Sequence, residues 1–397
     1  MPNVTFVVIR AAVLGVSWAT AAAAQGATRG LPKPEVEHRE PFTAISGLRE
    51  LSNGRVIVAD GRDKTLQLID LVRGTATPVG RAGAGPGEWG TPTTLYPLPG
   101  DSTLMPDWSN ARLLLIGPDG KPAGTRPLAG EGMLFAADLI GIDGSGRMLL
   151  RQSRRPARPT DPSVGMAELL VHDRRSARTD TIGTLTEPQG EMTAARLLPG
   201  GMVQWSTNLP LAARDLAAIA PDGRVAIVRA APYRVEWIAP NGTRITGPVA
   251  QGPAIRVTDD EKAAFAKSQL RPGGIIVAGP SGAPPAAKGA ASPRARTPKL
   301  SKADIERMLT PDQTWPEVKP PFLDKAAGVA PDGRLWVLRT RAHDDPVPTY
   351  DVFDGAGRVV ERVALPLAAR LIGFGKGTLY LARTDDDELV WLQRVRR

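Results

Sequence analysis

Glycines at positions 85, 87 and 90 form a G-x-G-x-x-G pattern within AGAGPGEWGTP, residues 82–92. This pattern holds a dinucleotide pyrophosphate when it follows a buried strand and opens a helix, because the helix N-terminus supplies amide donors. Here the next residues are TPTTLYPLPGD, whose prolines and β-branched side chains favour a strand over a helix. The sequence therefore does not predict a dinucleotide site, and we expect this loop to have another role.

Histidine and acidic residues are the candidates for metal chemistry. The three histidines are His38, His172 and His343, and no two of them have the spacing of a metal site. The acidic runs at 385–388 and 344–345 lack the central glycine of a calcium-binding loop. We expect solvated acidic turns there, and the sequence predicts no metal and no cofactor.

Nucleophilic chemistry has one candidate, Ser102 in PGDSTL, which matches the Gly-Asp-Ser of some esterases. We expect this serine in a hairpin turn with no histidine near it in the sequence, so that turn formation explains it. Cysteine is absent, which excludes thiolate nucleophiles, thiolate metal ligands and disulfides. The sequence predicts no catalytic residue.

Residues 1–24 predict a secretory signal peptide. They contain one charged residue, Arg10, and then a neutral apolar run ending in Ala22 and Ala24 with small-x-small spacing. A buried N-terminal helix is the alternative. No other segment is apolar over the ~18 residues of a membrane span, so we expect a periplasmic or secreted protein with no membrane span.

The formal net charge is +9, of which Arg10 contributes one. A positive charge favours acidic polysaccharides or anionic headgroups as partners. The basic residues are scattered and lack the interleaved aromatic residues of nucleic-acid sites, so we expect no nucleic-acid partner. A solvated basic surface is the simplest interpretation.

A recurring hairpin organises most of the 397-residue chain. Each copy places a glycine turn between two short apolar runs, as in AIAPDGRVAIVR. The turn glycines are Gly54, Gly100, Gly146, Gly223, Gly333 and Gly377, and several spacings are near the ~45 residues of a four-stranded propeller blade. A second set, Gly74, Gly120, Gly242 and Gly357, follows after about 20 residues. The pattern predicts an all-β fold, a six-bladed β-propeller over residues 35–397.

The sixth blade, from residue 369 on, supplies three strands. An empty fourth position would leave a sheet edge with unpaired backbone groups. We expect residues 36–44 (VEHREPFTA) to fill it, so that an N-terminal strand closes the ring.

Two insertions interrupt the blades. Residues 186–212 contain the hairpin-like ARLLPGGMVQWS, which is either an excursion or part of an extra blade. Residues 251–320 lie between blades four and five and predict a short helix that starts with a capping box, Thr258 and Glu261. A second helix after Ser301 and an intervening disordered Pro, Ala, Gly and Ser tract complete this insertion. Both insertions join outermost to innermost strands, so we expect them on one face of the propeller.

That elaborated face is the expected binding face, because loops on a rigid scaffold commonly carry function. It also receives the loops between the second and third strands of each blade. Its candidate contact residues are Asp107, Trp108, Asn110, Arg154, His343 and Asp344. Trp108 is either a recognition anchor or a residue packed over the next blade.

The loop at residues 82–92 carries a family resemblance. Its residues Gly83, Gly85, Pro86, Gly87, Glu88 and Trp89, together with PDGR turns at 221–224 and 331–334, resemble exported bacterial six-bladed β-propellers related to NHL-repeat proteins. In that family the loop joins the first blade to the second, which implies a structural role for these six residues. We expect Trp89 between the two blades and Glu88 accepting backbone N–H bonds in the turn. The resemblance implies a fold and no specific activity.

These observations favour a non-enzymatic exported binding propeller that is a monomer and whose ligand is an unknown protein or glycan. A metal-dependent hydrolase or lyase of the propeller lactonase type is one alternative. The other is a protein that binds carbohydrate or an acidic polymer.

Overall fold

The structure is a computed structural model that describes residues 28–127, 137–153, 165–188, 196–197, 203–204, 209–268 and 313–397. The expected signal peptide at 1–24, the second helix after Ser301 and its neighbouring tract lie outside these residues. In the described segments, no helix is long and apolar enough to cross a membrane.

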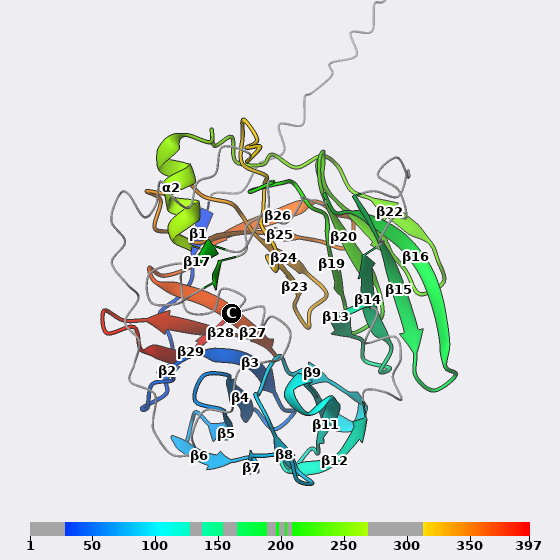
Figure 1. Ribbon diagram of the computed structural model, residues 1–397, viewed down its shortest axis with the longest axis vertical. Coiled ribbons are helices and arrows are strands. Elements are labelled where there is room, and N and C mark those ends of the chain that lie inside the picture. The colour runs from blue at the N-terminus through cyan, green and yellow to red at the C-terminus, as the bar shows by residue number, and fades with distance from the viewer. Residues whose placement is uncertain are drawn as a thin grey trace, which may run out of the picture.

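Six four-stranded blades follow one another around the molecule (Figure 1), which confirms the predicted six-bladed β-propeller. The first blade holds β3 (Ile45–Glu50), β4 (Val56–Asp60), β5 (Thr65–Asp70) and β6 (Thr75–Pro78), and the second holds β9 (Tyr96–Pro97), β10 (Thr103–Asp107), β11 (Arg112–Ile116) and β12 (Pro122–Pro127). The third holds β13 (Asp138–Ile142), β14 (Met148–Ser153), β15 (Met166–Asp173) and β16 (Arg178–Thr186), and the fourth holds β19 (Leu216–Ile219), β20 (Val225–Ala230), β21 (Tyr233–Ile238) and β22 (Arg244–Thr246). The fifth holds β23 (Ala327–Val329), β24 (Leu335–Leu338), β25 (Thr349–Phe353) and β26 (Val359–Ala364), and the sixth holds β27 (Ala369–Gly375), β28 (Thr378–Thr384), β29 (Val390–Arg396) and β2 (Val36–Glu37).

The turns form where the sequence predicts them. All ten predicted turn glycines have positive φ, between 68° and 89°, a conformation that costs glycine nothing in steric strain. The third blade lacks a glycine between β15 and β16, and Ala177 adopts the same conformation there, with φ of 54°.

The N-terminal strand closes the ring, as predicted. Strand β2 runs antiparallel to β29 and pairs Val36 with Arg394, while Phe42 bridges Val390 further along. The blue β2 and red β29 lie side by side in Figure 1. The edge of β29 is thereby paired.

One strand was not predicted. Strand β1 (Thr28–Gly30) adds to the fifth blade, parallel to the outermost strand β26. Its residues are all exposed and show no apolar alternation, so hydrophobic periodicity gives no signal for it.

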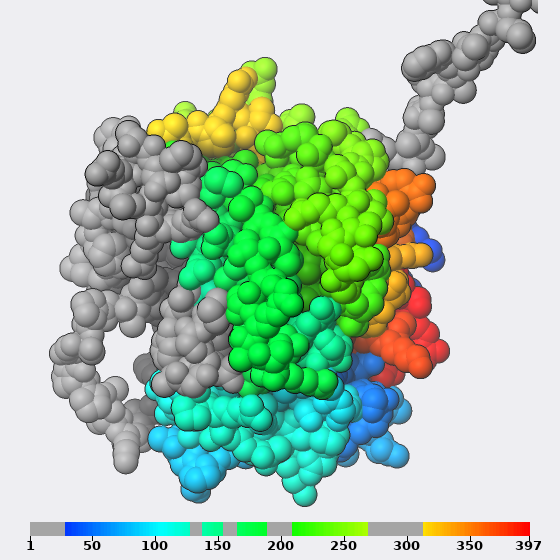
Figure 2. Space-filling view, turned by 90° about the vertical axis from the view of Figure 1, so that its right-hand side faces the viewer, coloured from blue at the N-terminus to red at the C-terminus, as the bar shows by residue number. Residues whose placement is uncertain are grey.

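Hydrophobic clusters fill the junctions between neighbouring blades. The described residues form six such clusters, and each joins two consecutive blades around the ring. Fully buried tryptophans anchor three of them: Trp89 between blades one and two, Trp237 between four and five, and Trp336 between five and six. Because each blade buries both faces, its inner strands contain continuous apolar runs such as VIVA, residues 56–59, in β4. In Figure 2 the second blade (cyan) and the green third and fourth blades are in direct contact.

The insertions lie where the sequence places them. Helix α2 (Asp259–Ser268) lies between the fourth and fifth blades, and Glu261 N donates to Thr258 Oγ1 at 3.4 Å at its start. The capping box is only half formed, because the Glu261 carboxylate bonds outside the helix rather than to Thr258. In the 186–212 region, β17 (Arg196–Leu197) and β18 (Val203–Gln204) form an isolated hairpin, while most of its other residues lie outside the described segments.

Candidate functional site

The loop between the first two blades is held by its own glutamate. It contains β7 (Arg81–Ala82) and β8 (Glu88–Trp89), which pair in parallel. One Glu88 oxygen accepts Gly85 N–H at 2.7 Å, and the other accepts Arg81 Nε at 2.6 Å. These bonds, with Gly85 the larger cause, lower the pKa of Glu88. Trp89 is 1% exposed and lies in the cluster between the blades.

Two of the proposed contact residues hold this loop in place. Asp107 is fully buried and accepts hydrogen bonds from Gly90 N at 3.1 Å and Asn110 Nδ2 at 2.7 Å. Asn110 Nδ2 also reaches Gly83 O at 3.0 Å, and Arg112 pairs with Asp107 at 3.3 Å. These polar groups are therefore occupied by the protein itself. Trp108 beside them is half exposed, at 50%.

The other proposed contact residues lie elsewhere. His343, in the loop between β24 and β25 of the fifth blade, donates its backbone N–H to Glu261 at 2.8 Å, and its Nδ1 lies 3.3 Å from the same oxygen. Asp344 is exposed, and Arg154 is outside the described residues. Since Trp108 belongs to the second blade, the ring places it away from His343. The structure therefore does not gather these residues into one site.

The innermost strands run in the same direction along the ring axis. Gly144 N–H donates to Pro221 O at 2.9 Å just after β13 and β19 end, and Arg370 donates to Ile45 O at 2.6 Å near the starts of β27 and β3. The starts of these strands therefore share one end of the ring, which we call the mouth. It is the end that carries α2 and the loops between second and third strands.

Five charged residues at the mouth form a group that we call the mouth cluster: Asp138, Arg151, Glu187, Arg214 and Asp324. Arg151 pairs with Asp138 at 2.7 Å and with Glu187 at 3.5 Å. Arg214, just before β19, lies 4.0 Å from Asp324, which precedes β23. The cluster thus spans the third, fourth and fifth blades. Asp138 and Asp324 keep 69% and 60% of their side chains exposed, so ligand atoms can reach them.

Charges couple across this cluster. Burial acts to lower the pKa of Arg151, but hydrogen bonding to Asp138 and the charges of Glu187 and Asp324 outweigh it and raise that pKa. Asp324 therefore lies within electrostatic reach of the third blade.

Arg370 lies at the same end, in the sixth blade. Its side chain is exposed, yet desolvation by the surrounding protein lowers its pKa. Its hydrogen bond to Ile45 O is to a neutral group, and within the described segments it pairs with no carboxylate. A guanidinium with this environment can bind a carboxylate or phosphate in bidentate fashion.

Sequence reasoning missed the mouth cluster and Arg370. Counting outward from the turn at Gly146 would place Leu139 opposite Arg151, and only a register shift between Leu139 and Gly141 makes Asp138 the partner, so the local sequence did not indicate this pair. Nothing local indicates the approach of Arg214 to Asp324. Among the described residues, no three His, Cys, Asp or Glu side chains are grouped so as to hold a metal ion.

Comparison with known proteins finds only structural similarity at low sequence identity. No protein-family model matches the chain, and no curated protein matches its sequence. It is similar in structure to a putative exported protein from Bacteroides fragilis (TM-score 0.45, 11% identity, covering 92% of this chain and 93% of that one). It is also similar to a gluconolactonase from Xanthomonas campestris (0.42, 10%, 92% and 90%) and a virginiamycin B lyase from Staphylococcus aureus (0.41, 10%, 92% and 98%).

Proposed function

We propose that this protein is an exported, non-enzymatic binding propeller that takes a polar ligand, a glycan or a peptide, at the mouth. The observation that carries this proposal is that the charged side chains of the mouth cluster are only partly paired, and that Arg370 lies at the same end of the ring without a carboxylate partner among the described residues. Each carboxylate of Asp138 and Asp324 is paired on one side and exposed on the other. We further propose that it acts as a monomer.

The chemistry favours a ligand rich in hydroxyl, amide or carboxylate groups. Exposed carboxylates accept hydrogen bonds from hydroxyl or amide groups, whereas the guanidinium groups of Arg151, Arg214 and Arg370 donate to acceptors. The mouth cluster with Arg370 has three positive and three negative side chains, so it does not select strongly for net charge. A neutral or weakly acidic glycan therefore matches it better than a polyanion.

The test is binding of the purified protein to an array of neutral and acidic glycans and to a peptide library. We expect one ligand class to be retained, and Arg370→Gln and Asp324→Asn each to weaken its binding about tenfold, the effect of losing one charge-assisted hydrogen bond. Arg178→Gln is the matched control, because Arg178 lies on the outermost strand β16 and is 74% exposed. Equal binding by all variants, or retention of no glycan or peptide, would refute the proposal.

Metal analysis of the same protein addresses the lactonase-type alternative. Stoichiometric Ca²⁺ or Zn²⁺ would favour an enzyme over a binding protein. N-terminal sequencing of the protein recovered from cells tests export, with cleavage after Ala24 expected.

A further inference from the structure

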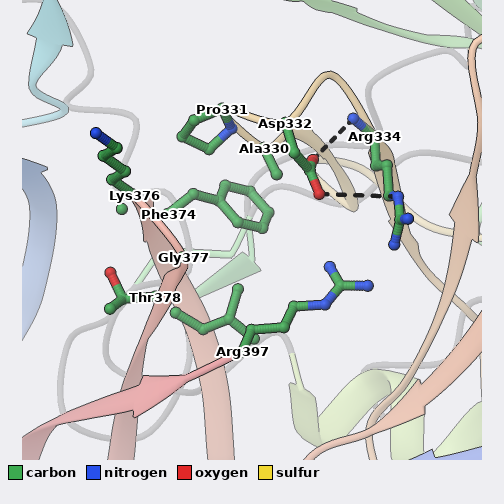
Figure 3. A pocket seen from close by; sticks show the side chains of 11 residues that line it. Ala330, Pro331, Asp332, Arg334, Phe374, Lys376, Gly377, Thr378 and Arg397 are labelled. Atoms are coloured by element: carbon green, nitrogen blue, oxygen red, sulfur yellow. Dashed lines mark hydrogen bonds and ion pairs between the residues drawn. The ribbon is translucent and has the colours of Figure 1, made fainter.

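A cavity of about 390 Å³ lies at the opposite end of the ring from the mouth, between the first turns of blades five and six. Its wall includes the PDGR turn of the fifth blade, with Asp332 and Arg334, and Phe374, Lys376 and Arg397 of the sixth. In Figure 3 the Phe374 ring lies between Lys376 and the Asp332–Arg334 pair, with Arg397 beside them. This volume is within the range of small-molecule sites.

A second cavity of about 280 Å³ shares Arg334 and Arg397 with the first. Arg29 and Gly30 of the unpredicted strand β1 form part of its wall, and Glu361 and Arg396 form another part. Residues far apart in the sequence therefore build one basic region across the blade junction.

The cations of the cavity differ in how firmly they are paired. The Arg397 guanidinium already has two partners, because it lies 4.4 Å over the Trp336 ring and bonds Glu361 at 2.5 Å. Arg334 is held loosely, at 3.8 Å from Asp332 and 3.9 Å from Glu361. The ammonium of Lys376 pairs with no carboxylate in the described part of the chain, where only its backbone N–H is engaged, by Glu50 at 3.0 Å.

The fourth blade carries the same PDGR turn and shows what a purely structural arginine does there. Arg224 pairs with Asp222 at 2.7 Å and lies 4.8 Å over the Trp237 ring. Trp237 Nε1 in turn donates to Asp354 O at 3.0 Å, which fills the junction between blades four and five. The identical turn one blade later leaves its arginine loosely paired beside an open cavity. The turn motif alone therefore does not explain the position of Arg334.

We propose that this cavity binds a small organic carboxylate with a flat apolar body. Arg334 would hold the carboxylate, since its ion pairs of 3.8 Å and 3.9 Å leave its guanidinium with hydrogen-bonding capacity, whereas the Lys376 ammonium lies on the other side of Phe374 and points away (Figure 3). Phe374 is only partly buried and offers apolar surface to the body of the ligand. The site is independent of the ligand proposed for the mouth, because it lies at the other end of the ring.

Benzoate is the probe, measured by ligand-observed NMR titration on the full chain, with benzamide as its uncharged counterpart. We expect saturable benzoate binding, at least tenfold weaker for benzamide. Arg334→Gln should weaken benzoate binding about tenfold. Arg224→Gln, the same change in the identical turn of blade four, should leave benzoate affinity unchanged.

Three results would overturn the proposal: no saturation by benzoate, equal binding of benzamide, or equal loss in the Arg224 control. Circular dichroism melting of each variant confirms that it is folded. Arg370→Gln should not alter benzoate affinity, so failure here is distinguishable from failure of the proposed function.

Discussion

Replacing Trp89 by alanine tests the packing of the first blade junction. The indole is 1% exposed and belongs to the cluster that joins blades one and two. A Cβ built on Gly80 would lie 2.5 Å from Trp89 Cζ3, so backbone already contacts the ring. The surrounding strands are therefore unable to collapse far into the space that the ring leaves.

The expected cost follows from packing alone. Trp89 Nε1 has no hydrogen-bond partner among the described residues, so the expected loss comes from packing and not from a hydrogen bond of that nitrogen. Replacing a buried aromatic side chain by alanine lowers the free energy of unfolding by about 3–5 kcal/mol, and a cavity that relaxes little belongs in the upper half of this range. We expect about 4 kcal/mol, a large part of the 5–15 kcal/mol typical of a folded domain.

Urea unfolding followed by far-ultraviolet circular dichroism measures this loss. Trp108→Ala is the matched control, because the same substitution at a residue 50% exposed should change the free energy of unfolding by less than about 1 kcal/mol. A Trp89→Ala loss below about 1 kcal/mol, or a loss equal to that of Trp108→Ala, would refute the packing argument.

Two further predictions concern buried carboxylates. Asp107→Ala leaves Arg112 without its buried partner and should lower the free energy of unfolding by about 3 kcal/mol, against less than about 0.5 kcal/mol for exposed Asp344→Ala in the same urea assay. Burial acts to raise the pKa of Glu261, but hydrogen bonds from Lys319 and His343 outweigh it and hold the pKa below the ordinary 4.5. A depressed carboxyl pKa stabilises fully above 4.5, and this contribution is lost as pH falls through the lowered value. The protection of residues 259–268 against hydrogen exchange, relative to the intrinsic rate at each pH, should therefore fall in acid. In Glu261→Gln this protection should already be low at pH 7. If the wild-type protein keeps the same protection in acid as at pH 7, the role given to Glu261 is contradicted.

The fold was predictable because its signals are local. A tight hairpin turn favours a glycine with positive φ whatever surrounds it, and the predicted glycines all adopt that conformation. Closure by residues 36–44 followed from counting strands, since an unpaired β29 edge needed a partner. Strand β1 escaped prediction because its three exposed residues bury no apolar side chain.

The candidate sites were not predictable in the same way. Asp107 and Asn110 have the residue types of a binding loop, and only their partners, Gly90 and Gly83, show that they hold backbone. Glu261 has the spacing of a capping box, but its carboxylate pairs with Lys319, 58 positions further along the chain (319 − 261).

By itself the sequence determined the number of blades, the positions of the turns and the closing strand, because backbone geometry and edge pairing depend on neighbouring residues. Only the tertiary structure decided which charges meet. Arg214 approaches Asp324 from a different blade. Arg224 lies 2.7 Å from the aspartate of its PDGR turn, whereas Arg334 lies 3.8 Å from the aspartate of the same turn one blade later. The physical reason is that closing the ring brings side chains of different blades together. The side chains present at each junction then determine the partner of a charged group.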